Sequence, residues 1–588
     1  MQGIMTRHRP TCCWQNGSFL TLSWLTGLLA ILGGLPVAST FSRAEEAVPG
    51  ERPNVVLVLT DDQGYGDLGC HGNPVIKTPN LDRLHQESLR LTDYHVDPTC
   101  SPTRAALMTG RYSCRTGVWH TIMGRSLLRR DETTMAELFR RAGYRTAIVG
   151  KWHLGDNHPY HPWNRGFEEC LIHFGGGIGQ GPDYWGNTYL SPTLNHNGQW
   201  EKHEGYCTDI FFRKAMEYIT THRAEPFFVY LPTNAPHGPL QVEDRYAEPY
   251  RQAGLPDNLA KFYGMITNID ENMGRLMELL RTLNLESRTI LIFMTDNGTA
   301  GNGFNAGMRG KKGSQYDGGH RVPCFIRWPG HLPSNKDFSH LTAHIDILPT
   351  LLDLCGIPAP AEVKFDGISL KPYLTESAMR FPERTLFVQV NRIDHPVPWR
   401  LSAVMTDEYR LVDGKELYQM KDDPGQTKDL AATHPQIVAE LRQRYEAWYA
   451  DVSQRFDEYC ELVLGSDEEN PATLCSHDWH GESVPWDQSQ MARGMSGNGF
   501  WVVEFAKPGR YRFALRDRPA HATVTLPQGT ARLVVEGFLD QEKPIPNGSH
   551  EVTFEAELPA GKTRLQTFLT LPDGTTRGFY FVVVSRLP

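Results

Sequence analysis

Four oxygen-bearing side chains directly follow two apolar runs in this 588-residue chain. They are Asp61 and Asp62 after the first run and Asp296 and Asn297 after the second. For any one of them, turn chemistry is a sufficient explanation, because Asp and Asn are common where strands end. Three carboxylates gathered in one place would repel one another, and a hard divalent cation would relieve that repulsion. Carboxylate and amide oxygens suit calcium or magnesium rather than zinc.

Basic side chains form a second set. Lys151, His153 and His237 follow two further apolar runs, and the segment MRGKKGSQYDGGHRVP contributes Lys311 and Lys312. Each of them alone is explained equally well as a structural or solvated side chain. Gathered with a metal at one sheet edge, they would form a pocket for a compact, multiply oxygenated anion, with phosphate and sulfate as the obvious candidates.

The stretch HVDPTCSPTRAALMTGRY places a cysteine at a predicted helix start. Cys100 and Ser101 occupy the N-cap region and Pro102 fits the first turn. A helix N-terminus favours negative charge and would lower the pKa of a thiol. A buried or disulfide-bonded cysteine is the plain alternative, but it does not explain why Arg104 follows one turn later at the same corner.

The segment CSPTRAALMTGR resembles the C-x-[PA]-x-R signature of the type I sulfatases in the alkaline phosphatase superfamily. The resemblance extends over about residues 53–432, through PNVVLVLTDDQGYGDLGCHG, TGRY, GKWHLG, NRGF, APHGP, TDNG, GKKGSQYDGGHRVP, HIDILPTLLDLCGI and ELYQMKDDPGQTKDLA. It implies that Cys100 is oxidised to formylglycine (3-oxoalanine) by a transiently bound formylglycine-generating enzyme before folding. Thr103 stands where many members have Ser, and Asp317 where many have Glu; both are mild departures.

The resemblance also implies roles for individual residues. Arg104 would hold the formylglycine hydrate, and Lys312 is preferred to Lys311 because it directly precedes Gly313, as the family lysine precedes its glycine. The catalytic set would be Cys100, Arg104, Lys151, His153, His237 and Lys312, of which Lys151, His237 and Lys312 would bind the sulfate. The implied ligands of one cation, usually Ca²⁺ and less often Mg²⁺, are Asp61, Asp62, Cys100, Asp296 and Asn297.

The implied reaction is hydrolysis of a sulfate monoester, on a carbohydrate or an aryl alcohol, through covalent catalysis. One hydroxyl of the hydrate would attack sulfur, His237 or Lys312 would protonate the departing oxygen, and His153 would serve as the base that releases sulfate. A phosphomonoester or phosphonate hydrolase of the same superfamily is the alternative enzyme, although no His and Asp set for two zinc ions can be assembled. A non-catalytic glycan-binding protein is the alternative from another class.

The elements that must position these residues are short apolar runs alternating with helical patterns. Continuous apolar runs predict strands buried on both faces of a parallel sheet, and the alternation predicts an α/β fold. Ligands of such sheets bind beyond the carboxyl ends of the strands, where the polar residues stand. The predicted strands are residues 54–60, 145–150, 227–231 and 289–295, and the predicted helices are residues 81–91, 135–142 and 262–283.

The pattern changes towards the C-terminus. We predict an α/β catalytic domain over residues 45–378, with a mostly parallel central sheet flanked by helices. A small antiparallel α+β subdomain is predicted over residues 379–455, followed by an acidic linker and an additional all-β sandwich-like domain over residues 456–588. Its aromatic residues, such as Trp501 and Tyr511, fit core positions at strand spacing better than a sugar-binding surface.

Residues 1–44 carry arginines, then an interrupted apolar run, then small residues, which predicts a secretory signal peptide. No later segment approaches the roughly 20 apolar residues of a membrane span. We therefore expect a secreted or periplasmic protein, with no membrane association after signal removal. The net charge of −9 argues against a nucleic-acid partner. Of the cysteines beyond the signal, Cys460 and Cys475 are candidates for a disulfide.

Overall fold

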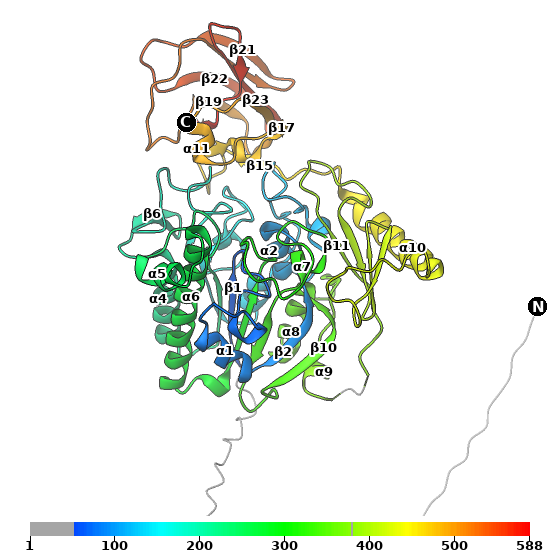
Figure 1. The fold of residues 1–588 in the computed structure, drawn as a ribbon. Helices are drawn as coiled ribbons and strands as arrows, with labels where there is room; N and C mark the ends of the chain where they lie inside the picture. The colour runs from blue at the N-terminus through cyan, green and yellow to red at the C-terminus, as the bar shows by residue number, and fades with distance from the viewer. Residues whose placement is uncertain (1–51, 378–379) are drawn as a thin grey trace, which may run out of the picture. The chain divides into compact units, whose positions relative to one another are not determined.

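The structure is a computed structural model that describes residues 52–377 and 380–588, so the predicted signal peptide lies outside the described residues. Its largest sheet has ten strands in the order β10-β2-β9-β8-β1-β7-β3-β4-β5-β6 (Figure 1). The neighbours from β8 to β4 in this order pair in parallel. The strands are β1 Asn54–Thr60, β2 Leu89–His95, β3 Arg145–Lys151, β4 Glu169–His173, β5 Thr193–His196, β6 Gln199–Lys202, β7 Phe227–Pro232, β8 Thr289–Thr295, β9 Cys324–Arg327 and β10 Lys336–Ala343.

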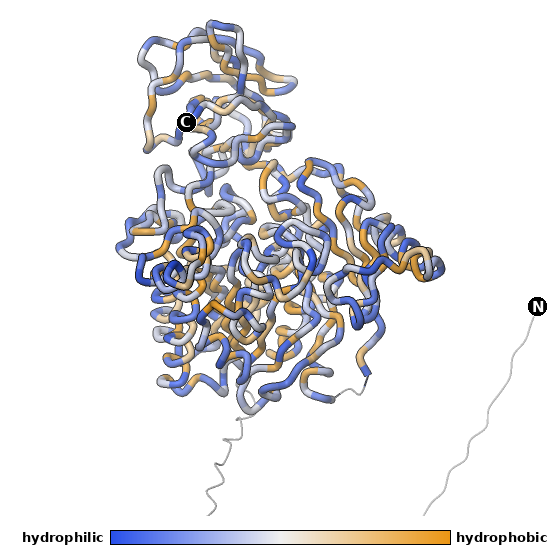
Figure 2. Tube along the Cα trace, in the orientation of Figure 1, coloured by the Kyte–Doolittle hydropathy of each residue, from blue (hydrophilic) through white to orange (hydrophobic). Residues whose placement is uncertain are grey.

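Helices cover both faces of this sheet. Val55 and Leu57 of β1 pack in one core with Leu107 of α2, whereas Val56 packs in a second core with Leu276 of α6. Apolar residues accordingly concentrate along the central strands (Figure 2). The helices of this region are α1 Pro79–Gln86, α2 Cys100–Thr109, α3 Met135–Arg141, α4 Cys207–Thr221, α5 Asp244–Gln252, α6 Asp257–Thr282, α7 Asp317–His320, α8 Ile347–Leu354 and α9 Lys371–Leu374. The predicted α/β class is confirmed.

The helix predicted over residues 81–91 is wrong in its second half. Helix α1 ends at Gln86, and β2 begins at Leu89. Leu89 pairs with Ile326 of β9, and β2 also pairs in parallel with β10. The apolar spacing continues across the boundary because Leu89 and Leu91 point into a core as strand residues.

A second, four-stranded antiparallel sheet lies between residues 386 and 419, in the order β11-β12-β13-β14. Its strands are β11 Leu386–Gln389, β12 Ser402–Met405, β13 Tyr409–Val412 and β14 Glu416–Gln419, and α10 Pro435–Val452 packs on it. This arrangement has the strands and the terminal helix expected of the small subdomain. Arg410 of β13 joins it to the main sheet, because its Nη2 lies 2.8 Å from Oδ1 of Asp93 on β2.

Two further sheets formed by residues 462–586 share one core. Their orders are β15-β18-β23-β20-β21, with β17 and β24 attached, and β16-β25-β19-β22. Trp501 and Tyr511 are buried in that core, as predicted. The strands are β15 Leu462–Leu464, β16 Ala472–Cys475, β17 His480–Ser483, β18 Asn498–Phe505, β19 Gly509–Arg516, β20 Thr530–Val535, β21 Leu539–Pro544, β22 Val552–Leu558, β23 Gly561–Thr570, β24 Thr576–Arg577 and β25 Phe581–Arg586, with the short helix α11 Gln488–Ala492.

Part of the predicted acidic linker is a strand instead. Residues Leu462–Leu464 form the buried strand β15, which pairs in parallel with β18. The domain boundaries stay predictions. The core around Trp501 also contains Leu127 and Tyr160, which precede the predicted boundary at residue 456.

All nine cysteines of the described residues are free, and Cys460 and Cys475 are both buried. The proposed pairing of these two cysteines is therefore wrong. Cys460 contacts the carbonyl oxygen of Leu127, whereas Cys475 ends β16. Within residues 52–377 and 380–588, no helix combines the length and apolar composition needed to cross a membrane.

Candidate active site

The ends of β1 and β8 bring the four predicted oxygen ligands together. The last residues of these parallel strands are register partners, so the residues that follow them share one edge of the sheet. The backbone N–H of Asp62 donates to Oδ1 of Asp296 at 3.1 Å, and Nδ2 of Asn297 donates to Oδ1 of Asp62 at 2.9 Å. These three residues and Asp61 are buried. Burial raises the pKa of Asp61, and burial together with the charge of Asp61 raises the pKa of Asp296.

Two oxygens in this group are buried without a hydrogen-bond donor, namely Oδ1 of Asp61 and Oδ1 of Asn297. An orphaned buried acceptor costs about 1–3 kcal/mol, so a cation between them would be stabilising. A carboxylate oxygen of Asp61, a carboxylate oxygen of Asp296 and Sγ of Cys100 lie within 4.8 Å of one another. The carboxylate and amide oxygens fit a hard divalent cation, with Asp61, Asp62, Asp296 and Asn297 as the residues that would hold it.

Arg104 and Lys151 lie against two of the carboxylates. Nη2 of Arg104 is 2.8 Å from Oδ2 of Asp296, and Nζ of Lys151 is 2.6 Å from Oδ2 of Asp61. Both basic side chains are completely buried. Burial opposes the charge on Arg104, but the carboxylate of Asp296 raises its pKa, so the guanidinium remains ionised.

Lys312, rather than its neighbour Lys311, reaches the same group. Nζ of Lys312 lies 2.6 Å from Oδ1 of Asp62, whereas Nζ of Lys311 donates to the side chain of Asn302 at 2.9 Å. Burial opposes the charge on Lys312, but the carboxylate of Asp62 raises its pKa. Three lysine and arginine charges therefore face three carboxylates, so a bound dication would make the site attractive to an anion.

Cys100 is the first residue of α2, and Thr99, not Cys100 or Ser101, is the N-cap. All ten residues of this helix are buried, so the thiol lies at the N-terminus of an enclosed helix. Pro102 stands in the first turn, as predicted. Because Arg104 follows one turn after Cys100, its guanidinium and the thiol lie at the same end of the helix.

His153 and His237 differ in which ring nitrogen makes a hydrogen bond to a backbone carbonyl. Nε2 of His153 lies 2.9 Å from the carbonyl oxygen of Thr121, and its buried Nδ1 has no partner. Nδ1 of His237 lies 2.7 Å from the carbonyl oxygen of Gly238, and its Nε2 lies 3.8 Å from Oδ2 of Asp62. Burial lowers the pKa of His237 to about 3 and that of His153 well below its ordinary value, so both rings are neutral near pH 7. A carbonyl accepts only from N–H, so the bonded nitrogens carry the protons.

A glycine-rich loop approaches both histidines. A Cβ atom on Gly176 would lie 2.7 Å from Cε1 of His153, and one on Gly177 would lie 3.0 Å from Cε1 of His237. Only glycine permits this approach without displacing a ring. The run of three glycines in HFGGGIGQ is the signal in the sequence for this loop.

Residues 475–488 hold that loop from the C-terminal sheets. The backbone N–H of Gly181 donates to the carbonyl of Trp486 at 2.8 Å, and Nε2 of Gln488 donates to the carbonyl of Gln180 at 2.9 Å. The backbone N–H of Met123 donates to the carbonyl of His477 at 2.8 Å. The ring of His477, which is not among the predicted site residues, lies 6.3 Å from that of His153.

The structure thus gathers every predicted site residue around one strand edge, while their chemical roles stay predictions. The residues are Asp61, Asp62, Cys100, Arg104, Lys151, His153, His237, Asp296, Asn297 and Lys312. Comparison with known proteins adds independent evidence on what such an arrangement does.

Residues 53–357 match the protein-family model described as Sulfatase, and residues 310–451 match that described as N-sulphoglucosamine sulphohydrolase, C-terminal. An N-acetylgalactosamine-6-sulfatase of Rattus norvegicus is 32% identical over 382 residues, which cover 58% of this chain and 69% of that protein. Arylsulfatase G of Rattus norvegicus is 30% identical over 405 residues, which cover 60% and 75%. The crystal structure of Ps i-CgsB in complex with k-i-k-neocarrahexaose matches with a TM-score of 0.64 and 28% identity, over 70% of this chain and 95% of that one.

Proposed function

The chain belongs to the sulfatase family and is a sulfuric ester hydrolase, and on that premise we propose that it removes sulfate from a sulfated carbohydrate through a formylglycine made from Cys100. The placement of Cys100 carries the proposal. The thiol stands at the N-terminus of a buried helix, within 4.8 Å of carboxylate oxygens of Asp61 and Asp296. Sulfur is a soft ligand beside these hard oxygens, whereas an oxygen at position 100 would match them.

Formylglycine at position 100, once hydrated, would supply one hydroxyl as the nucleophile and a second hydroxyl whose deprotonation would allow sulfate to leave. A bound Ca²⁺ supplies positive charge against the sulfate oxygens. Arg104, buried and ionised, orients the group at position 100 from one turn along α2. Lys151 and Lys312 bind the sulfate oxygens from two sides of the aspartate pair.

Lys312 serves as the proton donor of the reaction, and His153 serves as the proton acceptor. Nδ1 of His237 donates to the Gly238 carbonyl, so its Nε2 lacks a proton and serves to accept a hydrogen bond. Lys312, which carries its proton because the carboxylate of Asp62 raises its pKa, is then the group that can donate to the departing alcohol oxygen. Nδ1 of His153 is neutral and without a partner, which suits the base that takes the proton from the second hydroxyl.

The named relatives support a carbohydrate as the alcohol. One is a sulfatase of N-acetylgalactosamine, and the structure of Ps i-CgsB holds a neocarrahexaose. Export through residues 1–44 and transient contact with a formylglycine-generating enzyme complete the proposal, since the modification must precede closure of the buried helix around Cys100.

The test combines a mass map with substrate choice. Protein co-expressed with a formylglycine-generating enzyme should yield a peptide across Cys100 that is lighter by the difference between cysteine and formylglycine. The same preparation should hydrolyse 4-nitrophenyl sulfate faster than 4-nitrophenyl phosphate. An unmodified cysteine in active protein, or a clear preference for the phosphate, would overturn the proposal.

A further inference from the structure

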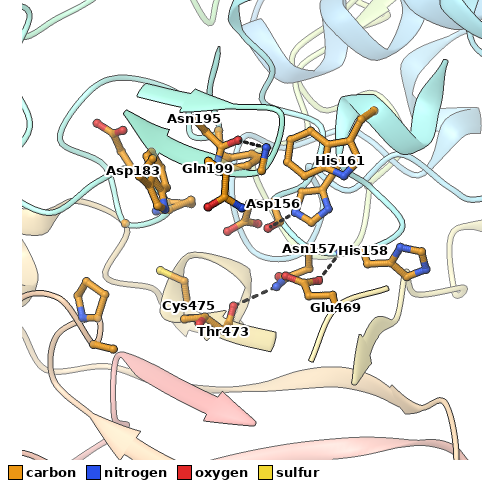
Figure 3. A pocket seen from close by; sticks show the side chains of 18 of the residues that line it. Asp156, Asn157, His158, His161, Asp183, Asn195, Gln199, Glu469, Thr473 and Cys475 are labelled. Atoms are coloured by element: carbon orange, nitrogen blue, oxygen red, sulfur yellow. Dashed lines mark hydrogen bonds between the residues drawn. The ribbon is translucent and has the colours of Figure 1, made fainter. Parts of the chain in front are cut away.

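A cavity of about 510 Å³ lies beside the candidate active site, between residues 156–200 and the C-terminal sheets (Figure 3). We name it the Trp200 cavity, after the most exposed aromatic side chain that lines it. Its walls come from residues 156–164, 174–183 and 195–200 on one side, and from residues 468–475, 519–521 and 581 on the other. The volume lies within the range of about 300–1,000 Å³ that is usual for small-molecule sites.

The glycine-rich loop joins this cavity to the candidate active site. Gly176 packs against His153 and Gly177 against His237, and the same loop continues to Gly181 and Asp183 in the cavity wall. A ligand that extends from the sulfate pocket along this loop would therefore enter the Trp200 cavity. The cavity is nevertheless distinct, because neither a predicted metal ligand nor a predicted sulfate-binding residue lines it.

Aromatic rings contribute to both walls of the cavity. The ring of His161 stacks on that of Trp163 at 4.2 Å, and Phe174 packs edge-on to Trp200 at 5.9 Å. Trp200 on β6 is 38% exposed, and His521 contributes a ring from the C-terminal sheets. Flat apolar rings of this kind bind the C–H face of a sugar, which is apolar although its rim carries hydroxyls.

Hydrogen-bonding side chains also line the cavity, from both of its walls. Oδ1 of Asn157 is buried and has no partner, although Asn157 is only 2% exposed and its Nδ2 donates to the Thr473 carbonyl at 3.1 Å. Figure 3 shows Asp156, Asn157 and Glu469 around the same space. Polar side chains of this kind match the hydroxyl groups at the rim of a sugar ring.

The charged groups that line the cavity indicate which class of sugar it would bind. Four carboxyl groups line the cavity, and no lysine or arginine does. Burial raises the pKa of Asp183 and that of Glu469 to about 7, so these carboxyls can donate as well as accept hydrogen bonds near neutral pH. A sulfate or carboxylate group would find no lysine or arginine to bind it here, whereas an uncharged sugar would find aromatic faces, donors and acceptors.

We propose that the Trp200 cavity binds an uncharged, unsulfated sugar unit of the same glycan whose sulfate enters the site at Cys100. This rests on the proposed function and extends it, because it makes the substrate an oligosaccharide rather than a single sulfated sugar. The walls at residues 468–475, 519–521 and 581 lie beyond both matched family models, which end at residues 357 and 451. The C-terminal sheets therefore contribute to a specificity that neither model covers.

The test uses the full-length, formylglycine-containing protein and uncharged hexasaccharides of galactose, of glucose and of N-acetylgalactosamine. Titration calorimetry should show that at least one of them binds, with a Kd raised about tenfold or more in Trp200→Ala and in His521→Ala. Both side chains are exposed, so these variants should fold. Phe538→Ala, which removes an exposed aromatic ring outside the cavity, is the matched control and should bind as the wild type does.

Hydrolysis of 4-nitrophenyl sulfate separates the two proposals, because this substrate carries no sugar unit to occupy the cavity. Turnover should be unchanged in Trp200→Ala and His521→Ala. Normal turnover without binding of any of the three hexasaccharides, or equal binding in the variants and the wild type, would overturn the cavity proposal alone. Absence of turnover in formylglycine-containing wild type would instead overturn the proposed function.

Discussion

Nη2 of Arg104 lies 2.8 Å from Oδ2 of Asp296, although 192 residues separate the two in the chain. The contact joins the helix that carries Cys100 to the strand end that carries the candidate metal ligands, and both side chains are completely buried. One charged hydrogen bond therefore fixes the distance between the helix of Cys100 and the candidate metal ligands. Stability and activity should both depend on it.

Arg104→Ala should lower the free energy of unfolding by about 3–5 kcal/mol, because it leaves buried carboxylates without their partner. Turnover of 4-nitrophenyl sulfate should be lost as well. Urea unfolding measures the first effect, with Arg532→Ala as the control, since Arg532 pairs with Asp540 at the surface. Equal shifts in the urea midpoint for the two variants would contradict the prediction.

Cys100→Ser should abolish turnover without unfolding the protein. Serine has nearly the volume of cysteine but cannot supply a hydrated aldehyde, so the second hydroxyl is missing. Turnover and melting temperature should be measured together. Cys70→Ser removes a half-buried thiol outside the site and should retain full turnover; substantial residual activity in Cys100→Ser would show that formylglycine is not required.

Removal of divalent cations by EDTA should reduce both turnover and melting temperature. Oδ1 of Asp61 and Oδ1 of Asn297 lose their only partner when the cation leaves. A ligand at about 100 times its Kd stabilises a fold by about 2.7 kcal/mol. Calcium should restore both properties better than magnesium, and Asn297→Leu should remove the response of the melting temperature to calcium. An unchanged melting temperature after EDTA in the wild type would count against a resident cation.

The stability of the fold should fall with rising pH in a way that depends partly on Asp183. Burial raises the pKa of this carboxyl in the folded state to about 7, from an ordinary value of 3.8, so the fold favours its protonated form. The stabilisation is complete below the unfolded pKa and is lost as the pH rises through about 7. The slope per proton is at most about 1.4 kcal/mol per pH unit.

Urea unfolding of the wild type and of Asp183→Asn at about pH 5 and about pH 8 measures this contribution. The variant should lose less stability between the two conditions, because its amide does not titrate but still accepts from the backbone N–H of Gly179. The exposed Asp573→Asn should behave as the wild type does. Identical pH dependence in all three proteins would refute the role of Asp183.

Gln488→Ala should weaken the support of the glycine-rich loop. Nε2 of Gln488 donates to the carbonyls of Gln180 and Asp183, and its Oε1 accepts from the backbone N–H of Gly186 at 2.9 Å. Leaving such buried groups unsatisfied costs about 1–3 kcal/mol. The melting temperature should fall and the KM for 4-nitrophenyl sulfate should rise, whereas the exposed Gln541→Ala should change neither. A variant with normal KM would mean that the loop keeps its position without this contact.

The elements that depend on local signals were predictable. The strands over residues 54–60 and 289–295 have the bounds that apolar continuity indicates, and the helix Met135–Arg141 ends one residue before its predicted end. Because parallel strands end at one edge, the same signals placed Asp61 beside Asp296. The resemblance at Cys100 then supplied chemistry that spacing alone left open.

What depends on distant partners was not predictable. Leu89 continues a helical spacing and becomes a strand only because β9 and β10 lie beside it. The contact of His477 with Met123 and the Trp200 cavity join segments more than 300 residues apart. No local pattern specifies the individual hydrogen bonds between residues 180–186 and residues 486–488.

The nine unpaired thiols bear on how the enzyme can be produced. None of the described cysteines forms a disulfide bond. Expression in a reducing bacterial cytoplasm, or reductant in the purification buffers, therefore removes no disulfide from the described fold. Under the proposed function, the one oxidation that a recombinant preparation needs is the conversion of Cys100 to formylglycine by a co-expressed formylglycine-generating enzyme. Preparations should then differ in specific activity with the fraction of molecules that carry this modification.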